Sequence, residues 1–229
     1  MKTIGLLGGM SWESTLGYYR AINEGIKDSL GGLHSAKIAI YSVDFDPIEK
    51  LQQQGDWEGT AEILIEAAKN VQAAGADFLL ICTNTMHRVA PQIEAAIDIP
   101  LLHIADATAE VLAKKGIETV GLLGTAFTME QQFYKGRLSE NYGLSVLVPN
   151  QADRAIVHDV IYQELCLGKA VPASKAEYLR IIESLANQGA EAVILGCTEI
   201  GMLVEQADTQ VILLDTTTIH AQKAVEYAL

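Results

Sequence analysis

The chain has 229 residues, 49% of them hydrophobic, and its 16 basic and 29 acidic residues give a formal net charge of −13. This length suits one large domain or two domains of roughly 100 residues each. No apolar stretch reaches the ~18 residues of a membrane-spanning helix. The acidic charge, without any Lys/Arg cluster, argues against nucleic acid and anionic membranes as partners.

The chain begins "MKTIGLLGGMSW", a short apolar run that is broken by Gly8 and Gly9 and followed by no small-residue cleavage site. We interpret it as a first strand and expect a cytoplasmic protein. Cys82, Cys166 and Cys197 are too few, and odd in number, for a disulfide framework. Neither a CxxC nor an HExxH spacing occurs, so we expect no metal site.

Along the chain, short apolar runs rich in β-branched residues alternate with longer amphipathic segments. The runs predict strands at 2–8, 37–43, 77–82, 100–104, 119–124, 144–148, 191–196 and 210–215. The clearest helices are predicted at about 11–29, 57–74, 154–167 and 174–188. Strands this apolar are buried on both faces, which is typical of parallel sheets in α/β proteins.

Three blocks of the first half recur in the second half, in the same order and at nearly constant spacing. The pairs are "KTIGLLGGM" with "ETVGLLGTA", "GADFLLICTNTM" with "GAEAVILGCTEI", and "DIPLLHIADAT" with "DTQVILLDTTT". The repeat predicts two pseudo-symmetric α/β lobes, each a parallel sheet flanked by helices, with the active site in the cleft between them. Lobe one is predicted to contain 1–104 plus 216–229, and lobe two 105–215.

Ligands of open parallel sheets bind outside the carboxyl ends of the strands. The polar and glycine-rich segments of this chain follow predicted strands, at 8–12, 82–87, 124–128 and 196–199. For Gly8, Gly9 and Gly124 the alternative stays open that strand ends simply collect turn residues.

The repeat also sets a register between two of these strand ends. When Gly75 is aligned with Gly189, Cys197 falls opposite Thr83, and Cys82 falls opposite Gly196. Because side chains on a strand alternate between faces, Thr83 and Cys197 should point the same way within their lobes. Cys82 would then be a small buried hydrophobic residue, although a one-residue bulge would reverse the assignment.

Cys197 has neighbours that favour a functional role. Gly196 allows close approach of the backbone, and Thr198 and Glu199 are polar residues at the end of a buried strand.

The segments "LLICTNTMH" and "VILGCTEIGML" resemble the paired cysteine signatures of the aspartate/glutamate racemase family. "GLLGGMSWEST" and "HIADAT" resemble its aspartate racemase branch, and the resemblance covers essentially the whole chain. It implies a cofactor-independent amino-acid racemase with two similar α/β lobes, expected to be a homodimer. In this family two cysteines on opposite faces of the substrate's α-carbon act as base and acid.

Residue by residue, Cys197 matches the second cysteine of the family. The first motif usually reads Cys-Asn-Thr, but this chain has one residue more, Cys82-Thr83-Asn84-Thr85. If Asn84-Thr85 anchors the match, Thr83 takes the place of the first cysteine, in agreement with the repeat. We therefore predict Thr83 and Cys197 as the catalytic pair, with Cys82 replacing Thr83 if the register is off by one.

Racemisation without a cofactor needs hydrogen-bond donors that stabilise the developing carbanion. Asn84, Thr85, Thr198 and Thr125 are the candidates, and Glu199 is expected to bind the substrate ammonium.

The resemblance adds two substrate contacts, Met10 and Gln52, although Gln52 could equally be a solvated helix position. His87, His103 and His220 are interpreted as core or helix-end histidines.

The two members of the predicted catalytic pair, Cys197 and Thr83, differ in acidity. A thiol becomes a usable base after a modest fall in pKa, whereas an alcohol is a poor base that can still deliver a proton. Cys197 is therefore expected to abstract the proton and Thr83 to return one, with better turnover of L- than of D-substrate. Since the antipodes are isoenergetic, kcat/KM must be equal in both directions.

The substrate side chain rests on the resemblance alone, because none of the five arginines (Arg20, Arg88, Arg137, Arg154 and Arg180) lies in a motif that would clamp a carboxylate. Three alternatives to an L-aspartate/L-glutamate racemase stay open. They are a broad-specificity racemase of neutral amino acids, a single-cysteine decarboxylase of the same superfamily, and a non-catalytic amino-acid-binding protein.

Overall fold

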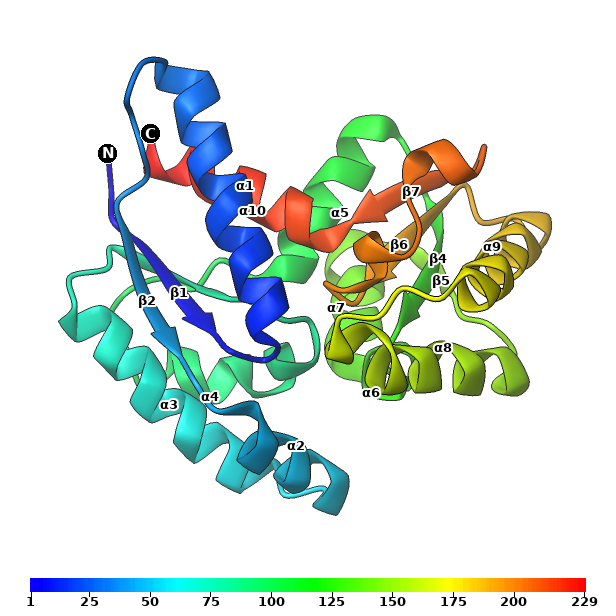
Figure 1. Ribbon diagram of the computed structural model, residues 1–229, viewed down its shortest axis with the longest axis horizontal. Helices are drawn as coiled ribbons and strands as arrows, with labels where there is room; N and C mark the ends of the chain where they lie inside the picture. The colour runs from blue at the N-terminus through cyan, green and yellow to red at the C-terminus, as the bar shows by residue number, and fades with distance from the viewer. The chain divides into compact units, whose positions relative to one another are not determined.

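The computed structural model describes all residues, 1–229, and divides into two compact units (Figure 1). Unit 1 contains Met1–Ile104 and His220–Leu229, and unit 2 contains Ala105–Ile219. The chain therefore leaves unit 1 once and returns to it once. The sequence predicts lobe boundaries at 104/105 and 215/216. In the structure the chain passes from one unit to the other at 104/105 and at 219/220.

Unit 1 is built on a parallel sheet of three strands in the order β2-β1-β3. The strands are β1 (Ile4–Gly8), β2 (Ile38–Ser42) and β3 (Phe78–Ile81). The helices of this half of the chain are α1 (Trp12–Leu30), α2 (Phe45–Gln54), α3 (Trp57–Ala73), the 3₁₀ helix η1 (Thr85–Val89) and α4 (Ala90–Glu94). Two further helices cross the unit boundaries, α5 (Ile104–Lys115) and α10 (Thr216–Ala228).

Unit 2 repeats this plan with one more strand. Its parallel sheet has the order β5-β4-β6-β7. The strands are β4 (Thr119–Gly124), β5 (Ser145–Leu147), β6 (Ala192–Gly196) and β7 (Ile212–Asp215). The helices are α6 (Ala126–Glu130), α7 (Gln132–Tyr142), α8 (Gln151–Gln163), α9 (Pro172–Asn187) and the short 3₁₀ turns η2 (Leu165–Leu167), η3 (Ile200–Met202) and η4 (Gln206–Asp208). The predicted α/β class, with two parallel sheets flanked by helices, is confirmed.

The predicted strand at 100–104 is wrong. Only Leu101 forms a bridge, to Leu79, through two backbone hydrogen bonds of 2.9 Å. The reason is local, because α5 begins at Ile104 and leaves too few extended residues for a strand. The bridge nevertheless occupies the position next to β3 that corresponds to the position of β7 next to β6 in unit 2.

Side chains of β3 alternate between two separate cores. Phe78, Leu80 and Cys82 pack with residues of α1 and α10, such as Tyr18 and Ala224. Leu79 and Ile81 pack with residues of α3 on the other face of the sheet. This two-sided burial is what a near-continuous apolar run predicts for a central parallel strand.

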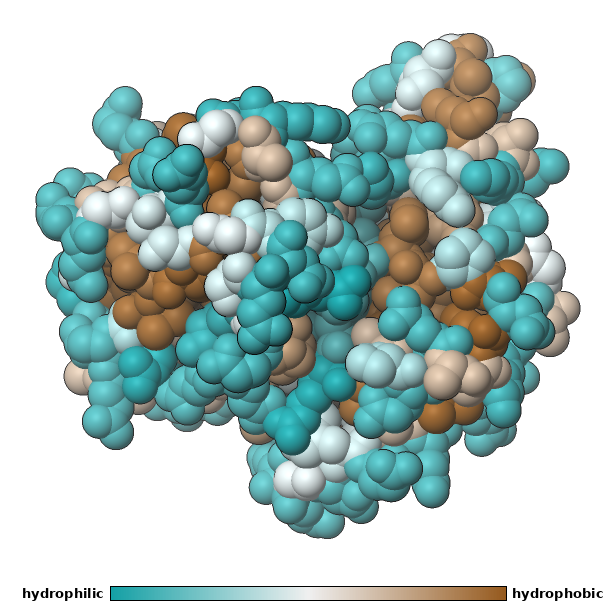
Figure 2. All heavy atoms as spheres, turned by 180° about the vertical axis from the view of Figure 1, so that it is seen from behind, coloured by the Kyte–Doolittle hydropathy of each residue, from teal (hydrophilic) through white to brown (hydrophobic).

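Hydrophilic atoms cover much of the surface, with apolar patches between them (Figure 2). Three large apolar side chains of helix α1, Trp12, Leu16 and Tyr19, are also 63%, 49% and 48% exposed. Their spacing places them on one side of the helix.

The expected homodimer and the cytoplasmic location stay predictions. No helix has the length and apolar character needed to cross a bilayer.

Unit 1 has a pH-sensitive element in its core, because His220 is fully buried. Its Nε2 donates to the Leu102 carbonyl at 2.8 Å, so its Nδ1 accepts the hydrogen bond of the Tyr18 hydroxyl, also at 2.8 Å. Burial lowers the pKa of His220 from 6.5 to about 4. The group therefore stays neutral in the folded protein and gains a proton on unfolding below pH 6.5.

Acidification should destabilise unit 1 through this histidine. The unfolded chain binds more protons than the folded one between pH 6.5 and about 4, so the contribution is fully present above pH 6.5 and is lost as the pH falls toward 4. From pH 7 to pH 5 the expected loss from His220 alone is ~2 kcal/mol. The measurement is denaturant unfolding followed by tryptophan fluorescence, since Trp12 and Trp57 both lie in unit 1.

His220→Gln removes this titrating group and should lower the slope between pH 7 and pH 5 by the share of His220, while the buried His87, whose pKa is also lowered, continues to contribute. His34→Gln is the matched control because His34 is exposed, and it should leave the slope unchanged. Equal slopes in the wild type and His220→Gln would contradict the prediction.

Candidate active site

Apart from Gln52, which lies in α2, the predicted site residues follow the carboxyl ends of β1, β3, β4 and β6. In unit 1, β1 pairs with β3, and the chain moves from β1 to β2 on one side and to β3 on the other. In unit 2, β4 has the same relation to β5 and β6. Such a switch point leaves a crevice at the strand ends, where ligands of α/β sheets bind.

At the end of β3 the structure separates Cys82 from Thr83. The Cys82 side chain is fully buried in the α1/α10 core, and this burial raises the pKa of its thiol far above the ordinary range. Thr83 is the next residue and lies beyond the last residue of β3, Ile81; strand alternation would place it on the side of Leu79 and Ile81. A thiol enclosed by apolar side chains cannot form a thiolate at neutral pH, so Cys82 is unsuited to be a base.

Cys197 has the corresponding phase in unit 2. It follows β6 and packs with Val193 and Leu195 against α8 and α9, and its side chain is 8% exposed. Thr83 is 9% exposed. Cys197 therefore lies on the side of β6 that faces α9, the helix preceding that strand. The choice of Thr83 over Cys82 stays a prediction.

Glycines bring the backbones together at the end of β6. Gly124 pairs with Gly196, and a Cβ added to Gly124 would lie 2.8 Å from the Gly196 carbonyl oxygen. A Cβ on Gly196 would lie 2.7 Å from the Leu123 carbonyl oxygen. In unit 1, Gly9 has φ +96° and its Cβ would lie 2.3 Å from the Val43 carbonyl oxygen. These glycines are required by close backbone packing.

The Cys197 thiol is hydrogen-bonded to a carboxylate. Its Sγ donates to Glu199 Oε2 at 3.0 Å, and the Thr198 hydroxyl donates to the same oxygen at 2.7 Å. Burial, followed by the charge of Glu199, raises the pKa of Cys197 well above its ordinary value. The backbone N–H of Glu199 acts in the opposite sense by stabilising the thiolate. In the free protein Cys197 is therefore a neutral thiol.

The other predicted residues of unit 1 lie close to the end of β3. Asn84 and Thr85 are buried, at the start of η1. Met10, after β1, is 3% exposed and packs in the α3 core. Gln52 is 3% exposed, with its amide nitrogen 3.9 Å from the Met86 sulfur. Gln52 is therefore not a solvated helix position.

The buried Gln52 side chain has an unusual feature. Its amide oxygen is enclosed and has no hydrogen-bond partner. A buried carbonyl without a partner costs ~1–3 kcal/mol, so proteins rarely retain one without a functional reason.

Thr125 has a structural task that the sequence interpretation missed. It is the N-cap of α6, and its hydroxyl accepts from the Thr128 backbone N–H at 3.3 Å. The pairing of Gly124 with Gly196 places Thr125 beside Cys197 in the sheet register. Its hydroxyl is thus already engaged in a cap, which leaves less hydrogen-bonding capacity for a ligand.

Two further side chains hold the end of β3, and neither was predicted to do so. The Ser14 hydroxyl of α1 donates to the Cys82 carbonyl at 2.9 Å. His87 Nδ1 lies 2.8 Å from the Thr83 carbonyl oxygen. The three histidines were expected to be core or helix-end residues, and His87, His103 and His220 are all buried.

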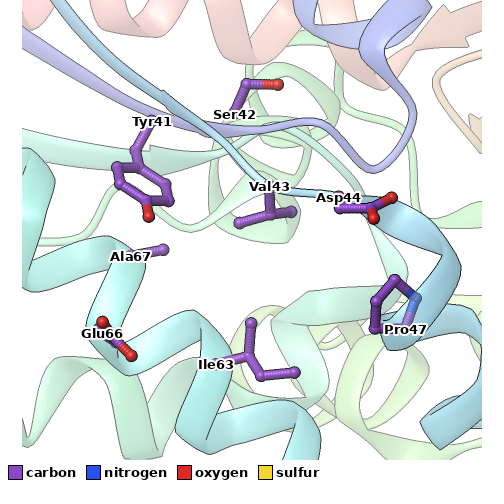
Figure 3. A pocket seen from close by; sticks show the side chains of 8 residues that line it. All are labelled: Tyr41, Ser42, Val43, Asp44, Pro47, Ile63, Glu66 and Ala67. Atoms are coloured by element: carbon purple, nitrogen blue, oxygen red, sulfur yellow. The ribbon is translucent and has the colours of Figure 1, made fainter.

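A separate pocket of about 260 Å³ lies in unit 1 beside the edge strand β2 (Figure 3). Its lining comes from the end of β2, from α2 and from α3, and includes Tyr41, Val43, Ile63 and Glu66. None of the predicted site residues lines it. We therefore place the candidate active site at the strand ends.

No group of three or more His, Cys, Asp or Glu side chains is placed to hold a metal ion.

Comparison with known proteins identifies the family. The profile of the Asp/Glu/hydantoin racemase family matches residues 7–224. A candidate Asp/Glu racemase from Yersinia pestis is 54% identical with a TM-score of 0.92, covering 100% of this chain and 99% of its own. An aspartate racemase homologue from Pyrococcus horikoshii is 37% identical with a TM-score of 0.86 over 100% and 99% of the two chains.

A more distant relative has a described activity. The broad-specificity amino-acid racemase RacX of Bacillus subtilis is 22% identical over 173 residues, which are 74% of this chain and 73% of RacX. These matches confirm the resemblance seen in the paired motifs. The chain belongs to the Asp/Glu/hydantoin racemase family and is therefore an isomerase of the amino-acid racemase type.

Proposed function

We propose that the protein racemises L-aspartate and L-glutamate without a cofactor, with Cys197 and Thr83 as the two proton-transfer groups. The observation that carries the proposal is the position of these two side chains. Cys197 packs on the α9 side of β6, and strand alternation would give Thr83 the equivalent position after β3, while the neighbouring Cys82 is enclosed in apolar core. The acidic substrates are supported by the family and by the two relatives of highest identity described above.

In the proposed reaction a two-base racemase needs its proton-transfer groups on opposite faces of one α-carbon. The Cys197 thiolate removes the α-proton of the L-substrate, and the Thr83 hydroxyl delivers a proton to the opposite face. The resulting alkoxide takes up a proton from water. Donors from Asn84 and Thr85 stabilise the charge that develops on the substrate carboxylate.

The thiolate must form when substrate binds, with loss of the thiol proton to solvent, because burial and Glu199 keep Cys197 protonated in the free enzyme. The substrate's ammonium group, held by Glu199, neutralises the charge that raises the thiol pKa. The Glu199 carboxylate already accepts bonds from Cys197 and Thr198, so an ammonium that reaches it comes close to the sulfur. Binding and activation of the base are thus coupled.

A second candidate is a racemase of broad specificity. RacX, which is described as having broad specificity, matches 74% of the chain. The arginines also favour it, because Arg137, Arg154 and Arg180 form ion pairs within unit 2 and Arg88 stacks on the Trp57 ring at 4.1 Å. The substrate panel below therefore includes a neutral amino acid.

The proposal is tested by α-proton exchange in D₂O, followed by NMR, together with inversion followed by chiral chromatography. L-Asp, L-Glu and L-Ala are each incubated with the wild type and with Cys197→Ala, Thr83→Ala and Cys82→Ala. We expect Cys197→Ala to lose exchange and inversion. Thr83→Ala should lose inversion by ~10²-fold or more, since it lacks the group that protonates the second face.

Cys82→Ala is the matched control. It should retain exchange and inversion and lose only ~1 kcal/mol of stability, because it removes a small buried side chain. An inactive Cys82→Ala would shift the catalytic pair to Cys82 and Cys197. A wild type that exchanges none of the substrates would overturn the proposed function, and faster turnover of L-Ala than of L-Asp would favour broad specificity.

Glu199→Gln separates binding from thiol chemistry. Removing the carboxylate charge should lower the pKa of Cys197, so the free enzyme should be alkylated faster by iodoacetamide at pH 8. Loss of the ammonium partner should raise KM by ~10- to 100-fold. The measurement uses a background of Cys82→Ala and Cys166→Ala, in which Cys197 is the only thiol. Slower alkylation, or an unchanged KM, would contradict the role of Glu199.

Gln52→Met should increase stability while weakening substrate binding. The substitution removes a buried amide oxygen without a partner, so we expect ~1 kcal/mol greater resistance to denaturant. If Gln52 binds substrate, KM should rise by ~10-fold at the same time. Gln53→Met, on the exposed side of α2, is the control and should change neither quantity. A less stable variant with an unchanged KM would show that Gln52 only packs.

A further inference from the structure

We propose that His87 is a positioning residue that holds the Thr83 carbonyl and thereby fixes the place from which the Thr83 hydroxyl delivers its proton. The inference rests on the proposed function, because it concerns the second half of the same reaction. It assigns a role to a buried group that the mechanism above does not use.

The hydrogen bonds of His87 determine its tautomer. Its Nε2 lies 3.3 Å from the backbone nitrogen of Ile104, at the start of α5, and that N–H can only donate. Nε2 must therefore be the unprotonated acceptor, which leaves the proton on Nδ1. Nδ1 then donates to the Thr83 carbonyl at 2.8 Å. One ring thus bridges the catalytic segment and the first residue of α5.

The surroundings of His87 keep it in this neutral form. It is 2% exposed, and the rings of His103 and His220 lie 4.4 Å and 6.0 Å from its own. His220 is in turn bonded to the Tyr18 hydroxyl. Burial and the two neighbouring histidines lower the pKa of His87 well below its ordinary value. A second proton, on Nε2, would oppose the Ile104 N–H.

The bond to Thr83 completes a pair of clamps on consecutive carbonyls. Ser14 holds the Cys82 carbonyl at 2.9 Å, and His87 holds that of Thr83. Beyond Ile81 the strand has ended, although the Cys82 N–H still donates to the Leu7 carbonyl of β1 at 2.9 Å, and the two side chains add to that bond in fixing the backbone. A hydroxyl acid must approach the α-carbon closely, and a misplacement of 1 Å can lower a rate by ~10²-fold.

Two substitutions of His87 distinguish its two hydrogen bonds. In His87→Asn the amide nitrogen takes the place of Nδ1 and can still donate to the Thr83 carbonyl, whereas the bond to Ile104 is lost. In His87→Gln the amide group reaches the place of Nε2 and its oxygen can accept from Ile104, whereas the bond to Thr83 is lost. The variants are matched in size and polarity and differ in which end of the bridge they keep.

The experiment measures two rates in one sample of L-aspartate in D₂O. Exchange of the α-proton with retention needs only Cys197, which removes a proton, exchanges it with solvent and returns a deuteron to the same face. Inversion also needs delivery from Thr83. The ratio of inversion to exchange therefore reports on Thr83 alone. It does not depend on how much of the sample is folded, because unfolded protein performs neither reaction.

We expect His87→Gln to lower this ratio by ~10- to 100-fold and His87→Asn to change it by less than ~3-fold. An unchanged ratio in His87→Gln, with both rates reduced equally, would show a merely structural role and overturn the inference. So would an equal fall of the ratio in both variants. A wild type that neither exchanges nor inverts would instead overturn the proposed function, and the inference with it.

Discussion

The alternation of side chains along β3 and β6 is the constraint on which the candidate active site depends. Both strands are central and buried on both faces, so every second side chain is committed to one core. Phe78, Leu80 and Cys82 pack together in the core formed with α1 and α10. Thr83 is the residue that follows, and its assignment to the strand-end site stays a prediction. Because the period of a strand is two, a cysteine and a threonine in adjacent positions cannot exchange roles without a bulge.

Two side chains of the candidate site are buried in unusual surroundings. The Cys197 thiol is buried beside a carboxylate that raises its pKa, and Gln52 has a buried amide oxygen without a partner. The Gln52 oxygen is unfavourable in the free protein, and under the proposed function a bound substrate would supply its missing donor and a positive charge beside Glu199. The pair His87 and His220 differs, because its hydrogen bonds are satisfied internally and burial lowers the pKa of each ring. It is therefore suited to hold a backbone and not to transfer protons.

Much of this could be predicted from the sequence because the deciding signals are local. The apolar runs define the strands, and the repeat sets the equivalence of Thr83 and Cys197. The failures come from contacts between distant residues. Nothing in the spacing of His87, His103 and His220 shows that their rings meet, and Ser14 binds a carbonyl 68 residues away. The short bridge at Leu101 was predicted as a strand because a buried apolar run gives no sign of the helix that begins at Ile104.

The ion pairs of the arginines limit how the side-chain carboxylate of an acidic substrate could be recognised. Arg137 forms two 2.6 Å hydrogen bonds with Asp106, and Arg180 is bonded to Asp153 and Glu177. To release either guanidinium would break an existing ion pair. Recognition would therefore fall to neutral donors, such as the Gln52 amide nitrogen, whose contact with the Met86 sulfur at 3.9 Å is weak. Neutral donors bind a carboxylate less strongly than a bidentate arginine. They also exclude neutral side chains less strictly, because an unfilled amide is a smaller penalty than an unpaired buried charge. Under the proposed function, a site built on such neutral donors would discriminate among substrate side chains by degree.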